Sequence, residues 1–213
     1  MNMQKKEWVA VFDCDGVMFD SRQSNINYYN HVRHHFSLPS LTEDEISYVH
    51  MHTADESIKY IFNETKLTDQ ALEYRDRMDY RPFMSDMIIE PDLKDLLKTL
   101  KPKIGLAVAT NRSNTIGEVL KTHDLEKYFD IVVSSLDVNH PKPHPESIFK
   151  ILDFFQADQN HCIYIGDSKI DYQTARSSRV IFVSYRNPEL KADFQIRRLR
   201  GILDVMRSFG LDC

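Results

Sequence analysis

Five short apolar runs, separated by longer amphipathic segments, constrain the fold of this chain most strongly. Each run is rich in β-branched or aromatic residues and lacks an alternation of polar and apolar positions. The runs are Trp8–Phe12, Ile104–Ala109, Ile131–Val133, Cys162–Ile165 and Val180–Val183. Strands of a parallel sheet have this pattern, because helices cover both faces of such a sheet. The runs therefore predict parallel strands buried on both faces.

The segments between these runs have the spacing of helices. Leucines stand at positions 93, 96, 97 and 100, and three further segments show a similar period: 113–123, 145–155 and 171–177. The tail, Phe194–Phe209, is also predicted as an amphipathic helix. Strands that alternate with helices are joined by right-handed crossovers. The predicted fold class is thus α/β, with a doubly wound parallel sheet.

The stretch from about Ser21 to Met87 departs from this alternation. It contains several helical patterns and no convincing strand, and Thr53-Ala54-Asp55-Glu56 has the form of a capping box at a helix start. We predict a small all-α cap domain over residues 20–87, inserted after the first strand. Residues 1–19 and 88–213 would then form the α/β core domain.

Composition and charge exclude some classes of function. The chain is 42% hydrophobic and 28% charged, which is ordinary for a globular protein, and its net charge of −5 gives no basic surface for nucleic acid. No apolar stretch approaches the length of a membrane span, and the run after Lys6 is too short for a signal peptide. Cys14, Cys162 and Cys213 show no disulfide or zinc spacing. We expect a cytoplasmic monomer or homodimer with neither a membrane nor a nucleic-acid partner.

Two carboxylates follow the first predicted strand. Asp13 and Asp15 are separated by one residue, at the strand end where α/β sheets bind ligands, and they could share a cation there. Gly16 allows the chain to leave the strand through a backbone conformation that most residues avoid. Taken alone, the pattern fits a solvated turn equally well.

Two further predicted strands are followed by groups that can hold a phosphate. Thr110 and Asn111 offer a hydroxyl and backbone N–H groups beside a helix start, although Thr110 taken alone is better explained as a helix cap. Lys142 lies between prolines, and a fixed ammonium there can neutralise a phosphoryl group, whereas most lone lysines are solvated. A metal site at His140 and His144 is the weaker interpretation, because no third nitrogen ligand is near.

A second pair of acids follows the fourth predicted strand. Asp167 and Asp171 could supply the hard oxygen ligands that magnesium prefers. Alternatively, Asp167 or Ser168 could simply cap the next helix, with Asp171 as an acid in its first turn that the helix dipole favours. The arrangement of all four elements decides between these interpretations. Each element ends a predicted strand, so parallel strands would bring an acid pair, a hydroxyl, a lysine and a second acid pair to one edge of the sheet.

On these motifs the chain resembles the haloacid dehalogenase superfamily. The match rests on Asp13-Cys14-Asp15-Gly16-Val17, on Thr110, on Lys142 and on the segment from Gly166 to Asp171. It covers nearly the whole chain. The insertion after the first motif is similar to that of the helical-cap subgroup, which includes phosphoglycolate phosphatase-like enzymes and β-phosphoglucomutase.

The resemblance implies a role for each motif residue. Asp13 would attack phosphorus and become a phosphoaspartate. Asp15 would protonate the leaving group and then activate water. Thr110, Asn111 and Lys142 would bind the phosphoryl oxygens. Mg²⁺ would be held by Asp13, by the backbone carbonyl of Asp15 and by Asp167, with Asp171 as a further ligand or as support for the ligands.

The resemblance further implies a magnesium-dependent phosphatase that acts on a small-molecule phosphomonoester. The acid at Asp15 argues against dehalogenation, because a halide leaving group needs no proton. Two alternatives stay open: a β-phosphoglucomutase-like phosphomutase and a catalytically silent phosphate-binding regulatory protein. The cap would supply specificity, for which Arg75, Arg77 and Arg81 are candidates, although acids beside them favour ordinary charge pairs on a helix.

Overall fold

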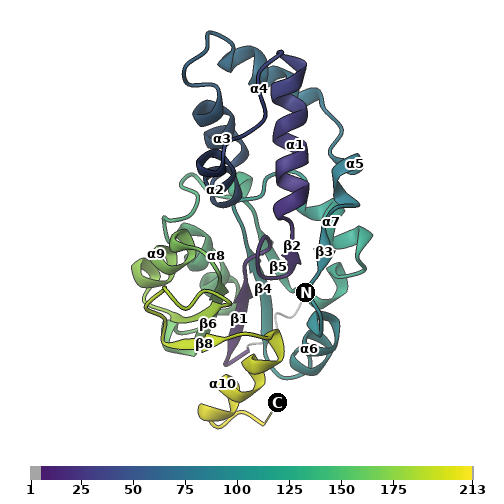
Figure 1. Ribbon diagram of the computed structural model, residues 1–213. Coiled ribbons are helices and arrows are strands. Elements are labelled where there is room, and N and C mark those ends of the chain that lie inside the picture. The colour runs from purple at the N-terminus through teal and green to yellow at the C-terminus, as the bar shows by residue number, and fades with distance from the viewer. Residues whose placement is uncertain (1–5, 213) are drawn as a thin grey trace.

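A single six-stranded parallel sheet forms the centre of the molecule. The computed structural model describes residues 6–212, and its strand order is β5-β4-β1-β6-β7-β8 (Figure 1). Every neighbouring pair in this sheet is parallel, so the predicted doubly wound α/β fold is confirmed. The strands are β1 (Val9–Phe12), β4 (Gly105–Ala109), β5 (Ile131–Val133), β6 (Cys162–Gly166), β7 (Ile181–Tyr185) and β8 (Phe194–Ile196).

Alternate residues of the strands pack into two separate hydrophobic cores. In β1, Ala10 and Phe12 belong to the core that also contains residues of α6, α7 and α10. Val9 and Val11 belong to the core formed with α8 and α9. This two-residue alternation, with both faces covered, explains why the strands are apolar throughout. The helices are α6 (Leu93–Leu100), α7 (Ile116–Thr122), α8 (Glu146–Phe155), α9 (Lys169–Ser178) and α10 (Ile202–Ser208).

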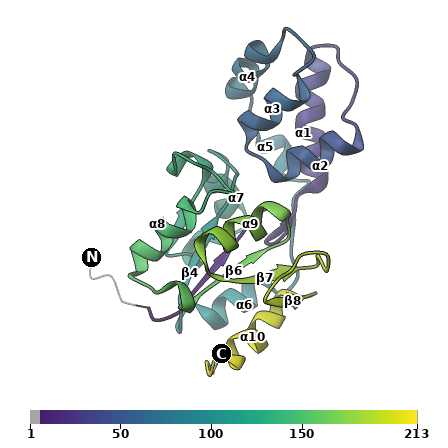
Figure 2. The same ribbon diagram turned by 90° about the vertical axis from the view of Figure 1, so that its left-hand side faces the viewer.

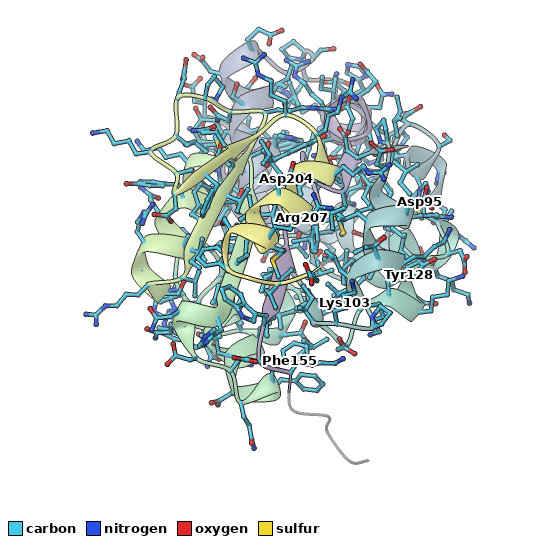
Figure 3. The ribbon with its side chains drawn as sticks, turned by 90° about the horizontal axis from the view of Figure 1, so that it is seen from below. Asp95, Lys103, Tyr128, Phe155, Asp204 and Arg207 are labelled. Carbon is cyan, nitrogen blue, oxygen red and sulfur yellow. The ribbon has the colours of Figure 1, made fainter. Side chains whose placement is uncertain are left out.

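The tail differs from its predicted single helix. Phe194–Ile196 forms the edge strand β8, a short 3₁₀ helix η4 (Leu199–Gly201) follows, and α10 begins only at Ile202. Pairing with the open edge of β7 outweighs local helix propensity here, because Val183 and Phe194 align in a parallel ladder. Helix α10, which carries Asp204 and Arg207, lies at the end of the molecule seen from below in Figure 3.

A two-stranded antiparallel ribbon carries the chain into and out of the helical insertion. Its strands are β2 (Phe19–Asp20) and β3 (Ile88–Ile89). Five helices lie between them and form a separate group beyond the sheet (Figures 1 and 2). The expected capping box is present, because Thr53 accepts from the backbone N–H of Glu56 and the carboxylate of Glu56 accepts in return. The five helices are α1 (Arg22–His35), α2 (Glu43–Met51), α3 (Ala54–Ile61), α4 (Thr68–Arg77) and α5 (Arg81–Met84).

Short 3₁₀ helices complete the connections: η1 (Glu126–Tyr128), η2 (Ser135–Asp137) and η3 (Gln159–His161). Cys14 and Cys162 are buried free thiols, whereas Cys213 and the start of the chain lie outside the described residues. Within residues 6–212, every helix is too short or too polar to cross a membrane.

Candidate active site

The buried pair of Asp13 and Lys142 lies at the centre of the site. Asp13 directly follows β1, and its backbone N–H donates to the carbonyl of Ile165, which continues the pairing with β6. The ammonium of Lys142 lies 2.8 Å from Asp13 Oδ1, and both side chains are almost fully buried. A buried charge is stable only with such a partner. The predicted convergence of these two residues, distant in the chain, is therefore observed.

Asn111 holds the loop that carries Lys142. Its amide oxygen accepts from the backbone N–H of Lys142 at 3.0 Å, and its amide nitrogen donates to the carbonyl of the same residue at 3.0 Å. The amide also reaches the carbonyl of Met51 in the insertion at 3.2 Å. The side chain of Asn111 thus positions the lysine loop, which leaves its backbone N–H as the group that could face a phosphate.

Asp171 and Tyr164 fix the ammonium of Lys142 from the other side. Lys142 donates to Asp171 Oδ1 at 2.7 Å and to the hydroxyl of Tyr164 at 2.9 Å. That hydroxyl donates to Asp171 Oδ1 at 2.5 Å, and Ser168 donates to Oδ2 through both its N–H and its hydroxyl. Ser168 and Asp171 form a capping box of α9, so the alternative of a capping role is also correct. With its lone pairs occupied, Asp171 suits support of a metal site better than direct ligation.

Tyr164 was not predicted as a site residue. It lies within the apolar run of β6 and is fully buried, so its pattern was that of a core residue. Only the three-dimensional contact with Lys142 reveals its polar role.

Asp167 completes a compact group of acids. Carboxylate oxygens of Asp13, Asp167 and Asp171 lie within 4.8 Å of one another. Asp167 packs against Gly16, which has a positive φ of 81°, and a Cβ built on Gly16 would lie only 2.2 Å from Asp167 Oδ2. Gly16 therefore serves both the sharp turn and the close approach of this carboxylate.

The electrostatics of these acids fit a bound divalent cation. Burial and the negative charge of Asp171 raise the pKa of Asp13 to about 7, although Lys142 opposes the shift. Burial and the charges of Asp171 and Asp13 likewise raise the pKa of Asp167 well above its usual range. Carboxylates that repel one another in a buried site are stabilised by a cation, and an all-oxygen donor set suits magnesium.

Arg112 clamps the second acid of the first motif. Its guanidinium donates to Asp15 Oδ1 at 2.5 Å and to Oδ2 at 3.1 Å, and both side chains are largely buried. Burial alone would raise the pKa of Asp15, but the charge and hydrogen bonds of Arg112 outweigh it and lower the pKa to about 2. No local pattern in the sequence indicates this role of Arg112, because its partner lies 97 residues away.

Thr110 also lies at this edge of the sheet. Its backbone N–H donates to the carbonyl of Val133, and its hydroxyl accepts from the backbone N–H of Arg112 at 3.1 Å. Thr110 therefore shapes the turn that directs Arg112, and it lines the same cavity as Asp13 and Lys142.

A cavity of about 540 Å³ separates the acids from the helical insertion. This size is typical of small-molecule sites. The insertion contributes a mixture of aromatic and polar side chains to its lining: Asn25, Tyr28, Tyr29, His50, His52, Arg75 and Tyr80. The core contributes Asp13, Asp15, Thr110, Asn111, Lys142 and Ser168.

The three candidate arginines of the insertion all form ion pairs with acids. Arg75 binds Asp55 and Asp76, Arg77 binds Glu73, and Arg81 binds Asp79. These contacts agree with the interpretation as helix charge pairs.

His140, His144 and Glu146 form a second close group, but it lies on the surface. The carboxylate of Glu146 accepts from the backbone N–H groups of Asn139 and His140 and contacts His140 Nδ1. Its hydrogen bonds are those of a loop cap at the start of α8.

Together, a buried aspartate paired with a lysine and two neighbouring acids, at the carboxyl edge of a parallel sheet, define a phosphohydrolase of the α/β class. The sequence profile of the haloacid dehalogenase-like hydrolase family matches residues 10–184, which is most of the chain. The chain belongs to this family.

Individual relatives agree with this assignment. Pyrophosphatase PpaX of Bacillus thuringiensis is 25% identical over 94% of this chain and 97% of its own length. A haloacid dehalogenase superfamily hydrolase of subfamily IA from Geobacter sulfurreducens is 33% identical, with a TM-score of 0.77 over 93% of this chain and 96% of that one.

Two solved structures of lower identity share the fold. A predicted phosphoglycolate phosphatase from Haemophilus somnus is 20% identical, with a TM-score of 0.81 over 96% of this chain and 100% of that one. The β-phosphoglucomutase of Clostridium difficile is 18% identical, with a TM-score of 0.81 over 96% and 98% of the two chains. The expected resemblance to the helical-cap subgroup is confirmed at the level of fold.

Proposed function

We propose that this chain is a magnesium-dependent phosphatase that hydrolyses a small phosphorylated molecule through a phosphoaspartate on Asp13. One observation carries the proposal: the ammonium of Lys142 lies 2.8 Å from Asp13 Oδ1, both residues line the cavity, and two more acids lie close to Asp13. A carboxylate that is buried, oriented and next to a fixed cation is suited to attack an anionic phosphorus.

In the first half-reaction, a carboxylate oxygen of Asp13 forms a bond to phosphorus. The bond between phosphorus and the leaving oxygen breaks. Asp15 must take up a proton before this step, because Arg112 favours its ionised form, and it then donates that proton to the leaving oxygen. Lys142 stabilises the negative charge on the phosphoryl group, while Asp171 and Tyr164 keep the ammonium in place.

In the second half-reaction, a water oxygen bonds to the phosphorus of the phosphoaspartate. The bond from phosphorus to the Asp13 oxygen breaks, and Asp15 takes the proton of the water. Phosphate leaves, and both aspartates return to their starting states. The insertion lines the cavity and would exclude other water from it.

Asp13, Asp167 and the backbone carbonyl of Asp15 would hold Mg²⁺, with Asp171 supporting the arrangement. The bound ion would supply positive charge that lets the anionic carboxylate of Asp13 approach an anionic phosphate. The mutual repulsion of the buried acids supports this assignment.

The cavity and the relatives favour a small substrate. Its volume of about 540 Å³ suits a compact phosphate ester or pyrophosphate. Pyrophosphate is a candidate because relatives of similar length are named as pyrophosphatases. Phosphoglycolate is a second candidate, suggested by a phosphatase of the same fold.

Phosphate release from a substrate panel tests the proposal. The panel contains pyrophosphate, phosphoglycolate, a sugar phosphate, a nucleoside monophosphate and an aryl phosphate, each with and without magnesium. Asp13→Asn keeps the size of the side chain, removes the nucleophile and should abolish release. Release that persists in Asp13→Asn, or in a metal chelator, would refute the proposed mechanism. Transfer of phosphate to a sugar in place of water would indicate the phosphomutase alternative.

A further inference from the structure

His140, His144 and Glu146 bring three metal-binding side chains together on the surface. One donor atom of each residue lies within 4.8 Å of the other two. The two imidazole rings are 4.7 Å apart, measured between their centres. The sequence offers no third nitrogen ligand near these histidines, but the fold places a carboxylate beside them. Two imidazoles, a carboxylate and a position left open for water form a common donor set of zinc.

The turn that carries Lys142 creates this arrangement. His140 and His144 lie two residues before and two residues after the lysine. The backbone N–H of His144 donates to the carbonyl of Pro141 at 3.0 Å, so the loop folds back and brings one histidine beside the other. Glu146 begins α8 directly after the loop. An ion shared by the three side chains would therefore hold the two ends of this loop together.

The carboxylate of Glu146 is held in one orientation by the backbone. Its two oxygens accept from the N–H groups of Asn139 and His140 at 2.9 and 3.0 Å. The hydrogen bond from Asn139, together with those from His140, lowers the pKa of Glu146 below its usual value, so this side chain is ionised at neutral pH. Proteins commonly orient carboxylate ligands of a metal through such outer hydrogen bonds.

The nitrogen and oxygen atoms lie near the separations that one zinc ion requires. Nδ1 of His140 is 3.1 Å from Oε2 of Glu146, and two tetrahedral ligands at ordinary Zn–N and Zn–O distances are about 3.4 Å apart. Nδ1 of His144 accepts from the backbone N–H of Glu146 at 3.3 Å and so carries the lone pair that a metal needs. This hydrogen bond is long, so its replacement by a metal bond costs little.

Exposure and donor type distinguish this group from the acids of the cavity. The side chain of His140 is 68% exposed, and His144 is exposed as well, so their rings can adjust to an ion that arrives from solvent. Imidazole nitrogens suit zinc, copper and nickel, whereas magnesium prefers oxygen ligands. The two groups should therefore bind different ions.

We propose that His140, His144 and Glu146 form a zinc-binding site that clamps the loop carrying Lys142. A loop cap accounts for the bonds of Glu146 to the backbone, but it requires neither imidazole ring. The three residues do not line the cavity, so the inference is independent of the proposed phosphatase activity.

Calorimetric titration with Zn²⁺ in an excess of Mg²⁺ tests the site. The unaltered protein should bind one equivalent more than His140→Gln/His144→Gln. His144→Gln alone should weaken this binding by about 10- to 100-fold, at least as much as the loss of an outer partner of a metal ligand. With Zn²⁺ at about 100 times its Kd, Tm of the unaltered protein should rise by about 5–10 °C more than Tm of the double variant. Hydrogen exchange of the backbone amides at 139–146 should become slower.

Two further proteins locate the bound ion. His34→Gln/His35→Gln is the matched control, because it removes two exposed histidines from α1, and it should keep the full zinc binding. Asp13→Asn removes a donor of the proposed magnesium site and should also keep it. Thermal unfolding without added metal shows whether each variant is folded.

Each result has a definite meaning for the site. Equal zinc binding by the unaltered protein and by His140→Gln/His144→Gln would overturn the inference. Loss of the extra equivalent in Asp13→Asn would place the ion at the acids of the cavity and would overturn it too. Zinc that binds without slowing exchange at 139–146 would overturn the clamping of the loop. A protein that releases no phosphate from the substrate panel, yet shows the expected zinc binding, would refute the proposed function and support this site.

Discussion

Gly16 lies so close to Asp167 that any side chain at position 16 must displace its carboxylate. A Cβ built on Gly16 would come within 2.2 Å of Asp167 Oδ2, and φ is +81°. The backbone strain of Gly16→Ala should cost about 1 kcal/mol of stability, because the flexible carboxylate can move away without disturbing the core. The proposed metal site should lose much more, with activity reduced on the order of 100-fold by the misplaced ligand.

Gly117→Ala is the matched control for this prediction. Gly117 lies in α7, and nothing lies within 4 Å of a Cβ built there. The control should keep full activity and gain about 0.5–1 kcal/mol in stability. The stabilisation of the protein by Mg²⁺, measured as a shift in Tm, provides a readout besides activity. A Gly16→Ala protein with unchanged magnesium response would show that Asp167 does not bind the ion.

Tyr164→Phe should weaken the proposed catalysis by loosening Lys142. The hydroxyl donates to Asp171 and accepts from Lys142, so its removal leaves two buried charged groups with one partner fewer. We expect stability to fall by about 1–3 kcal/mol and kcat by about 10-fold, with KM little changed.

Tyr128→Phe is the corresponding control, because Tyr128 is also buried but lies in η1, before the amino end of β5. Figure 3 labels it in the view from below. A merely structural role of Tyr164 would lower stability without moving the pH profile of kcat, whereas a positioning role moves both. An unchanged kcat and pH profile in Tyr164→Phe would exclude positioning.

Residues at the carboxyl ends of strands could be predicted from sequence because parallel topology brings them together. Asp13, Thr110, Lys142, Asp167 and Asp171 all lie near one edge of the sheet. Their individual explanations as caps or turns were also partly correct, since Ser168 and Asp171 do form a capping box. The sequence pattern could not separate the capping role from the role in the site, because the carboxylate of Asp171 has both.

The missed features depend on contacts that no local pattern encodes. Arg112 follows a predicted motif residue, but its partner Asp15 is 97 positions away. Tyr164 has the environment of a core residue except at its hydroxyl, which contacts Lys142 and Asp171. Phe194–Ile196 became a strand because the edge of β7 was open to pairing, which is a property of the assembled sheet.

The metal-free protein should lose stability as the pH rises from 3.8 to about 7. Burial and Asp171 raise the pKa of Asp13 from 3.8 to about 7, so the folded state binds this proton more tightly than the unfolded chain. The proton that Asp13 binds stabilises the folded state fully below pH 3.8, and this stabilisation is lost as the pH rises to about 7. The pKa of Asp167 is shifted in the same direction. The lowered pKa of Asp15 acts in the opposite sense, but only as the pH falls below 3.8 toward about 2.

Thermal unfolding in a chelator tests this dependence. Tm of the unaltered protein should decrease across the range, and each 1 kcal/mol corresponds to about 2–4 °C in a chain of this size. Asp13→Asn should flatten the curve, because the titrating group and its repulsion of Asp171 are gone. Magnesium should raise Tm most at the upper end of the range. Parallel curves for the two proteins would contradict the assignment to Asp13.

Glu90 should couple the return of the insertion to the end of β7. It directly follows β3, its carboxylate is almost fully buried, and it accepts from the hydroxyl of Tyr185 at 2.7 Å and from Arg186 at 2.5 Å. Glu90→Gln weakens both contacts and should lower the free energy of unfolding by about 1–3 kcal/mol. Tyr185→Phe removes one donor, so the two substitutions should be coupled by about 0.5–3 kcal/mol in a double-mutant cycle. Denaturant unfolding of the two single variants and the double variant measures this coupling. Additive effects would mean that Glu90 is held by Arg186 alone, and Arg186→Gln in the same cycle would then show the coupling.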